Sequence, residues 1–141
     1  MIEAQREILY IVLHCTATAQ TATKEAILSY WQNIKKWVWP GYHYLVKTDG
    51  KFSRLAYEHQ PTNGVYGYNQ NSIHICYIGG IDEKGRPMDN RTEAQKETLL
   101  FLVKWLKDKY PKAEILGHRD FPNVAKACPS FDARKEYQLI A

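Results

Sequence analysis

The stretch ILYIVLHCTAT, residues 8–18, decides the fold. Its first six residues are apolar and rich in β-branched side chains, which predicts a buried strand over residues 8–13. Polar residues follow at once, from His14 into the loop-like segment TATAQTAT, residues 16–23. A buried strand that ends on polar residues and leads into a loop is typical of an α/β sheet.

Working outward from this strand, Thr23 is placed to cap a helix, with Glu25 in the favoured first turn. This helix is expected to run to about Trp37, and Pro40-Gly41 breaks the pattern. Its expected apolar face consists of Ile27, Tyr30, Trp31 and Ile34.

The remaining elements follow from similar signals. Asp49-Gly50, between two strand-like runs, predicts a hairpin, and SIHICYI, residues 72–78, predicts another buried strand. Thr92 and Gln95 have the spacing of a capping box and open a long helix that Pro111 ends. A strand over residues 113–116 and a short helix over residues 133–139 complete the pattern. We therefore expect an α/β fold, a central mixed sheet flanked by helices on both faces, in a single domain, residues 1–141.

Composition and charge exclude several classes of protein. The chain is 45% hydrophobic and 24% charged, as in ordinary globular proteins, and its net charge of +4 is too small and dispersed to predict nucleic-acid binding. Three cysteines argue against a disulfide framework. The polar start MIEAQRE and the short first apolar run predict neither a secretory signal nor a membrane span. Synthesis in the cytoplasm is the expectation.

Three polar residues lie where strands end. His14 closes the first strand, His118 closes the last, and Cys128 follows in a proline-bounded loop. Two histidines and a thiolate are good zinc ligands, and three protein ligands leave a fourth position open. Each residue alone is equally compatible with a bland role, because strand-end histidines are commonly structural and lone cysteines commonly small buried hydrophobes.

Four local sequences resemble the type 2 N-acetylmuramoyl-L-alanine amidase family, which includes phage enzymes and the animal peptidoglycan recognition proteins. They span nearly the whole chain in the family's order, and their combined likeness is strongest to the phage enzymes. The four are IVLHCTAT (11–18), GYHYLVKTDG (41–50), GYNQNSIHICYIGGID (67–82) and GHRDFPNVAKACPSFD (117–132).

This resemblance implies zinc held by His14, His118 and Cys128, and it implies catalytic roles for Tyr42 of GYH and Lys126 of KAC. It also implies cleavage of peptidoglycan between the lactyl group of N-acetylmuramic acid and the first L-alanine. In that chemistry, Lys126 would stabilise the oxyanion and Tyr42 would orient water or pass on its proton.

The sequence departs from the resemblance in two places. First, Cys76 stands where some relatives carry a catalytic glutamate, so the catalytic role of that glutamate should fall to Tyr42. Second, residues 63–66 lack a histidine that the phage-like pattern has before GYN. Cys15 should point to the face opposite His14, and no partner is evident for His74 or for His59.

Several alternatives stay open at this stage. A structural role is favoured for His43, while Arg119 and Asp120 suit either contacts behind a zinc ligand or an ordinary surface pair. The amidase could be an endolysin, reaching the wall after release, or a recycling enzyme acting on soluble wall fragments. The rival functions are a binding module without catalysis and a regulatory protein that binds another macromolecule. The expected partner is peptidoglycan or its fragments, with no nucleic acid and no membrane, and the oligomeric state is open.

Overall fold

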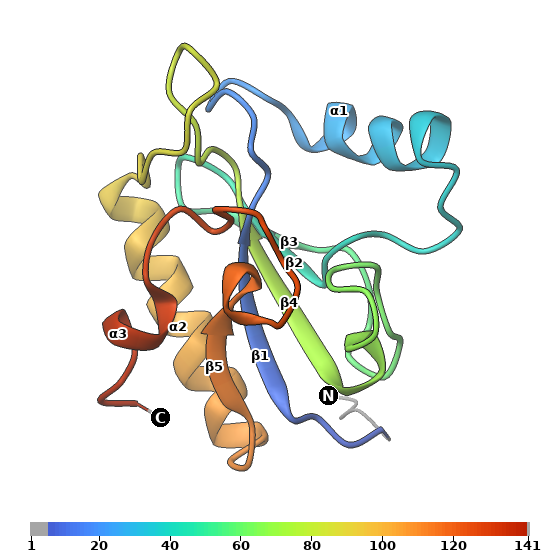
Figure 1. The fold of residues 1–141 in the computed structure, drawn as a ribbon, viewed down its shortest axis with the longest axis vertical. Coiled ribbons are helices and arrows are strands. Elements are labelled where there is room, and N and C mark those ends of the chain that lie inside the picture. Colours follow the sequence, from blue (N-terminus) through green and yellow to red (C-terminus); the bar gives the residue numbers. More distant parts are fainter. Residues whose placement is uncertain (1–5, 141) are drawn as a thin grey trace.

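A five-stranded mixed sheet forms the centre of the computed structural model, which describes residues 6–140 (Figure 1). The strand order is β3-β2-β4-β1-β5, and all neighbours pair in parallel except β2 and β3. This confirms the predicted mixed sheet. The strands are β1 (Tyr10–Cys15), β2 (Tyr44–Val46), β3 (Phe52–Arg54), β4 (Ser72–Tyr77) and β5 (Glu114–Gly117).

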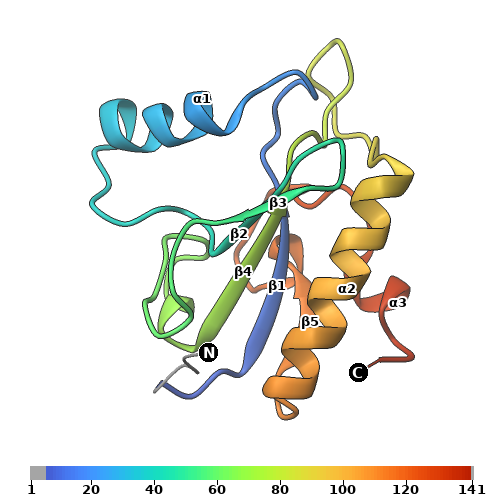
Figure 2. The ribbon, with the colours of Figure 1, turned by 180° about the vertical axis from the view of Figure 1, so that it is seen from behind.

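The long helix α2 (Glu93–Lys109) covers one face of the sheet, as Figure 2 shows. Its predicted capping box is present: the Thr92 hydroxyl accepts from the Gln95 backbone N–H, and the Gln95 side chain accepts from that of Thr92. The buried face of α2 packs on the odd-numbered side chains of β1, Ile11 and Leu13 among them. The short helix α3 (Ala133–Glu136) contributes Ala133 to the same core.

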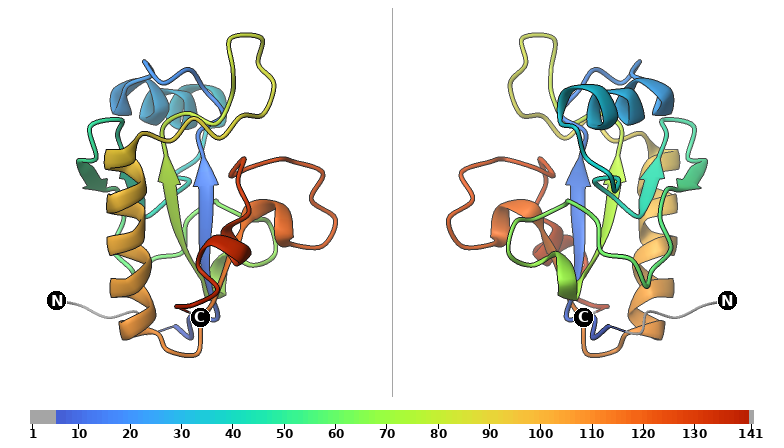
Figure 3. Two further views of the ribbon diagram at one scale, coloured as in Figure 1. Left: turned by 90° about the vertical axis from the view of Figure 1, so that its left-hand side faces the viewer. Right: turned by 90° about the vertical axis from the view of Figure 1, so that its right-hand side faces the viewer.

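The opposite face is covered by a helix at one end and by loops elsewhere. The helix α1 (Lys24–Ser29) begins at the predicted cap, since the Thr23 hydroxyl accepts from the Ala26 backbone N–H. It continues as a π-helical turn, η1 (Tyr30–Ile34). Figure 3 shows α2 on one side of the central strands and the segment that follows β5 on the other.

The predicted apolar face of the first helix is wrong at two of its four positions. Ile27 and Trp31 are buried, but Tyr30 and Ile34 are 48% and 68% exposed. The wider π turn rotates the side chains after Ser29 out of the 3.6-residue period on which the expectation rested.

Two other boundaries shape the site. The first strand runs two residues further than predicted, so that His14 and Cys15 belong to it and pair with Cys76 and Tyr77 of β4. The predicted hairpin is present, with Gly50 at a φ of +86°. In residues 6–140 no helix combines the length and the apolar character needed to cross a bilayer.

Candidate metal centre and active site

His14 lies near the carboxyl end of β1, on the face of the sheet opposite α2. Residues 12 and 14 of β1 point to that face, because side chains alternate along a strand and residues 11, 13 and 15 point toward α2. The side chain of His14 is buried, and its Nδ1 atom lies 3.8 Å from Sγ of Cys128. The strand thus presents one imidazole nitrogen to the loop that follows β5.

His118 opens the turn η3 (His118–Asp120), which directly follows β5. The Asp120 carboxylate caps this turn by accepting from the Gly117 backbone N–H at 2.8 Å. The Arg119 backbone N–H donates to the Cys128 carbonyl at 2.9 Å, which ties the two ligand-bearing segments together. A Cβ atom on Gly117 would lie 2.6 Å from Pro129, so the close approach of these segments requires glycine.

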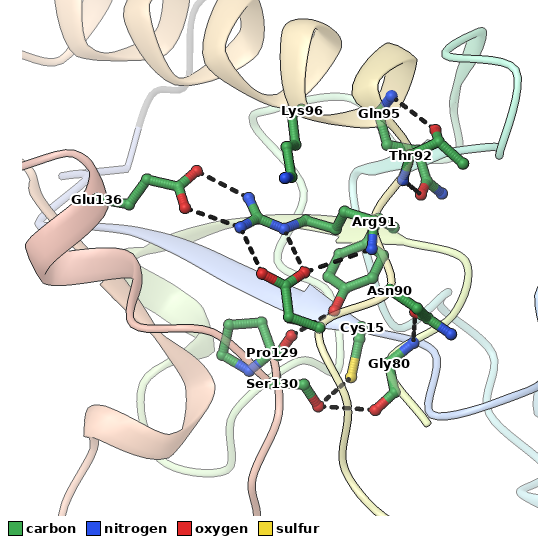
Figure 4. Close-up of polar contacts among 12 residues, drawn as sticks. Cys15, Gly80, Asn90, Arg91, Thr92, Gln95, Lys96, Pro129, Ser130 and Glu136 are labelled. Atoms are coloured by element: carbon green, nitrogen blue, oxygen red, sulfur yellow. Dashed lines mark hydrogen bonds and ion pairs between the residues drawn. The ribbon is translucent and has the colours of Figure 1, made fainter. Parts of the chain in front are cut away.

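The loop that carries Cys128 is fastened to the carboxyl end of β4. The Tyr77 hydroxyl donates to the Pro129 carbonyl at 2.6 Å, and the Ser130 hydroxyl donates to the Gly80 carbonyl at 2.8 Å. Figure 4 shows the Ser130 contact beside Cys15. These bonds hold the Cys128 sulfur where the Cys15 backbone N–H donates to it at 3.2 Å.

A buried arginine anchors the residues beyond this loop. The guanidinium of Arg91 donates to the carboxylates of Asp89 and Glu136 at 2.7–2.9 Å, and Figure 4 shows its paired contact with Glu136. The guanidinium also lies 3.5 Å from the centre of the Phe131 ring. These contacts join the segment before α2 to α3.

Cys15 lies on the α2 side of β1, as predicted. Its side chain packs with Ile11 and Leu13, away from the His14 ring. Its sulfur lies 3.8 Å from the Ser130 hydroxyl and hydrogen-bonds to the Cys128 sulfur, which also accepts from the Cys15 backbone N–H at 3.2 Å.

The three candidate ligands form one cluster. One donor atom from each of His14, His118 and Cys128 lies within 4.8 Å of the others. Tetrahedral zinc with nitrogen and sulfur ligands holds such atoms about 3.5 Å apart, so a small inward shift completes the set. If zinc bound here, two imidazoles and a thiolate would be three protein ligands, the number typical of catalytic rather than structural zinc sites.

The two histidines are neutral at pH 7, as metal ligation requires. Burial lowers the pKa of His14 well below its ordinary value, and the nearby His118 and Lys126 lower it further. Burial, together with the Lys126 cation, lowers the pKa of His118 to about 4. Hydrogen bonding to the Cys15 sulfur, with burial, raises the pKa of the Cys128 thiol in the metal-free chain, so metal binding must displace its proton.

Tyr42 and Lys126 lie beside this cluster and line a cleft with His118. The Tyr42 ring is centred 4.9 Å from the His14 ring and 5.3 Å from the Trp31 ring. Burial raises the pKa of the Tyr42 phenol well above its ordinary value, so it stays protonated and can donate. Lys126 is exposed at the mouth of the cleft, close enough to lower the pKa of both histidines.

The cleft is rich in aromatic side chains, and no carboxylate of residues 6–140 lines it. None of its lining residues, all within the described chain, is Asp or Glu. Cys76, at the position of the catalytic glutamate of some relatives, is fully buried, and burial raises its thiol pKa well above the ordinary value. It hydrogen-bonds to Tyr42, so it supports that phenol rather than acting on substrate. The aromatic lining comprises Tyr30, Trp31, Trp37, Tyr42 and Tyr66.

The expectation that His74 lacks a partner is wrong. His74 is fully buried, and its Nδ1 atom lies 2.8 Å from Nε2 of His14. The sequence marked it only by its place two residues before Cys76 on the same strand face. The register that pairs Val12 with His74 brings it beside His14, and this register is not readable from sequence. His59, by contrast, is exposed and stacks on Tyr57.

The fold and the cluster define an α/β protein with a His–His–Cys site at one face of a mixed sheet. Residues 4–131 match the family model described as N-acetylmuramoyl-L-alanine amidase, and the chain belongs to this family.

Known proteins agree with this membership. The endolysin of Klebsiella phage KP32 is 34% identical over 137 residues, covering 95% of this chain and 88% of that protein. The solved Ph2119 endolysin from a Thermus scotoductus bacteriophage superposes with a TM-score of 0.80 at 26% identity, over 99% of this chain and 88% of that one. Bumblebee PGRP-SA shares the fold, with a TM-score of 0.74 at 21% identity, over 98% and 87%.

Proposed function

We propose that His14, His118 and Cys128 hold the zinc with which this amidase cuts peptidoglycan between the lactyl group and the first L-alanine. The convergence of their three donor atoms within 4.8 Å carries the proposal. When bound, zinc polarises a carbonyl and lowers the pKa of bound water to about 7. Cys128 is the ligand that separates this reading from a binding module without catalysis.

The residues around the cluster are suited to an amide substrate. The Lys126 ammonium stands where it can stabilise the oxyanion that forms as the amide carbon becomes tetrahedral. The protonated Tyr42 phenol can hold the attacking water or donate a proton as the amine leaves. Trp31 packs against Tyr42 and limits the positions that its ring can take. We assign these roles to one catalytic domain, residues 1–141, because its site residues come from both halves of the chain.

The biological role that we propose is that of a phage or prophage endolysin. The similarity to the Klebsiella phage KP32 endolysin over 95% of this chain supports this role. Such an enzyme would be made in the cytoplasm and would meet its substrate, the cell wall, after release.

The decisive experiment identifies the bond that is cut. Purified sacculi digested with the chain should release peptides with a new L-alanine amino terminus and no new reducing sugar ends, as mass spectrometry would show. Glycosidases work with paired carboxylates, and none lines this cleft. New reducing ends without new amino groups would overturn the assignment. Turnover of sacculi compared with soluble fragments separates the endolysin role from recycling.

The metal is tested separately. Dialysis against a strong chelator should abolish turnover, and stoichiometric zinc should restore it. Full turnover in a sample with no measurable metal would refute the zinc proposal.

A further inference from the structure

A chain of hydrogen bonds runs from His14 away from the candidate metal centre. Nε2 of His14 lies 2.8 Å from Nδ1 of His74, and Nε2 of His74 lies 2.9 Å from Oδ1 of Asn69. Both imidazoles are at most 1% exposed, so the bond between them is shielded from water. Asn69 opens the turn η2 (Asn69–Asn71), just before β4.

The far end of this chain has a fixed polarity. Oδ1 of Asn69 also accepts from two backbone N–H groups, those of Gly64 at 3.1 Å and Val65 at 2.8 Å. A backbone N–H can only donate, so the side-chain atom that meets it must be the amide oxygen. The same oxygen faces His74, and Nε2 of His74 must therefore carry a proton and donate it.

The polarity passes from His74 to His14. A neutral imidazole has one N–H and one lone pair. With the proton of His74 on Nε2, its Nδ1 atom accepts, and the donor is Nε2–H of His14. The remaining lone pair of His14 is then on Nδ1, the atom that faces the Cys128 sulfur at 3.8 Å.

We propose that His74 and Asn69 are positioning residues, which fix His14 in the tautomer and ring orientation that present Nδ1 to zinc. This inference rests on the proposed zinc site. Histidine ligands of metals usually donate their other N–H to an acceptor that orients them, and here the acceptor is a second histidine oriented by an amide. Because this acceptor is a neutral imidazole rather than a carboxylate, it orients His14 without placing a negative charge beside it.

Close contacts with Gly64 and His43 hold the His74 ring in place. A Cβ atom on Gly64 would lie 2.4 Å from the His74 ring, so only glycine lets the loop lie against the imidazole. The backbone N–H of His74 donates to Nδ1 of His43 at 3.0 Å, and the two rings stack with centroids 6.0 Å apart. His43 thus has the structural role favoured from the sequence.

The tautomers can be observed directly. Two-bond ¹H–¹⁵N spectra of the imidazole rings, recorded with and without zinc, should show a proton on Nε2 of both His14 and His74. In His74→Leu, the metal-free His14 ring should no longer be confined to this tautomer. A proton on Nδ1 of His14 in the metal-free wild type would overturn the proposal.

Zinc affinity gives a second readout. Competition against a chromophoric chelator should show weaker binding by about 10–100-fold in His74→Leu, with Asn69→Leu weaker in the same direction. Asn69→Asp retains an oxygen acceptor for His74 and should weaken zinc binding less than Asn69→Leu does. Gln95→Leu is the matched control, since it removes a buried amide that donates to the Val46 and Ile78 carbonyls, remote from His14. It should lose stability and keep its zinc affinity.

The outcomes separate the two proposals. A wild type that binds no stoichiometric zinc contradicts the proposed function. A wild type that binds zinc, with affinity unchanged in folded His74→Leu and in Asn69→Leu, overturns only the positioning roles. If His74→Leu does not fold, Asn69→Leu and the wild-type spectra decide the question.

Discussion

The sulfur of Cys128 lies 3.8 Å from Nδ1 of His14, although 114 positions separate these residues in the chain. Two parallel strand pairings with β1 and the bonds that fasten residues 129 and 130 to β4 produce this contact. The Cys128 sulfur also accepts from the Cys15 backbone N–H. Cys15 thus contacts Cys128 through its backbone N–H and its sulfur, but only Cys128 belongs to the candidate ligand cluster.

The two cysteines should respond differently to the same substitution. Cys128→Ala removes a ligand, so the purified protein should lose stoichiometric zinc and turnover. Cys15→Ala keeps the backbone N–H that supports the Cys128 sulfur and should retain one zinc per chain. Metal analysis of both variants, beside their melting temperatures, makes the comparison. Zinc loss in Cys15→Ala without loss of fold would mean that the assignment of ligands is wrong.

Tyr42→Phe keeps the ring between His14 and Trp31 but deletes the hydroxyl. If that hydroxyl holds water or passes on a proton, turnover should fall by a factor on the order of 10²–10⁴. Zinc content and melting temperature should change little, because the phenol is not a ligand. If turnover instead stays near normal, Tyr42 is only a packing residue and another group supplies the proton transfer.

Lys126→Ala removes the cation that we propose stabilises the developing oxyanion. Losing one such donor typically costs about 10²–10³ in rate, while zinc content should be unchanged. Lys112→Ala is the control, since it removes another exposed lysine, one that does not line the cleft. Equal turnover in the two variants would remove Lys126 from the catalytic set.

Local signals predicted the framework of the fold. Thr23, the Thr92–Gln95 box and the turn at Gly50 each act through neighbours in sequence, and all three are confirmed. The π turn after Ser29 was not predicted, because it depends on how Trp31 packs against Leu45 and Cys76 from other strands. Tertiary contacts override the helical period there.

The candidate ligands were found from strand ends and motif likeness, and the structure brings them together. His74 was missed because its partner is set by the parallel register of β1 and β4, which no local pattern encodes. Asn69 was missed because its proposed role also depends on the tertiary structure. Its side-chain oxygen accepts hydrogen bonds from His74 and from two backbone N–H groups of a loop.

Arg91→Met should destabilise the fold. The guanidinium side chain is 2% exposed and bonds two carboxylates, whose side chains are 35% and 39% exposed. Removing one partner of a fully buried pair costs about 3–5 kcal/mol, and because these carboxylates can regain water we expect roughly 2–3 kcal/mol in urea unfolding. Arg86→Met, which breaks the exposed Arg86–Asp82 pair, should change the unfolding free energy far less, because water screens and solvates both of these charges. Equal losses would show that Arg91 contributes no more than a surface ion pair.

Glu58 links stability to pH. Its buried carboxylate accepts from Lys109 at 2.8 and 2.9 Å, from Tyr110 at 2.6 Å and from the Tyr44 hydroxyl. Burial alone would raise the pKa of Glu58, but the hydrogen bonds from Lys109 and the two tyrosines outweigh it, and the pKa is lowered in the folded chain. These donors hold the charged form better than water does in the unfolded chain.

A lowered folded pKa means that the unfolded chain binds the proton first as the pH falls. The stabilisation by Glu58 is therefore fully present above the ordinary glutamate pKa, about 4.3, and is lost as the pH drops through the folded value. Glu58→Gln removes the charge, so the difference in unfolding free energy between wild type and variant should be largest above about pH 5 and should shrink toward pH 3. Urea unfolding of both proteins at several pH values measures this difference. The other carboxylates titrate alike in both proteins, so their contribution cancels. A difference that stays constant from pH 7 to pH 3 would show that the charge of Glu58 contributes nothing to stability.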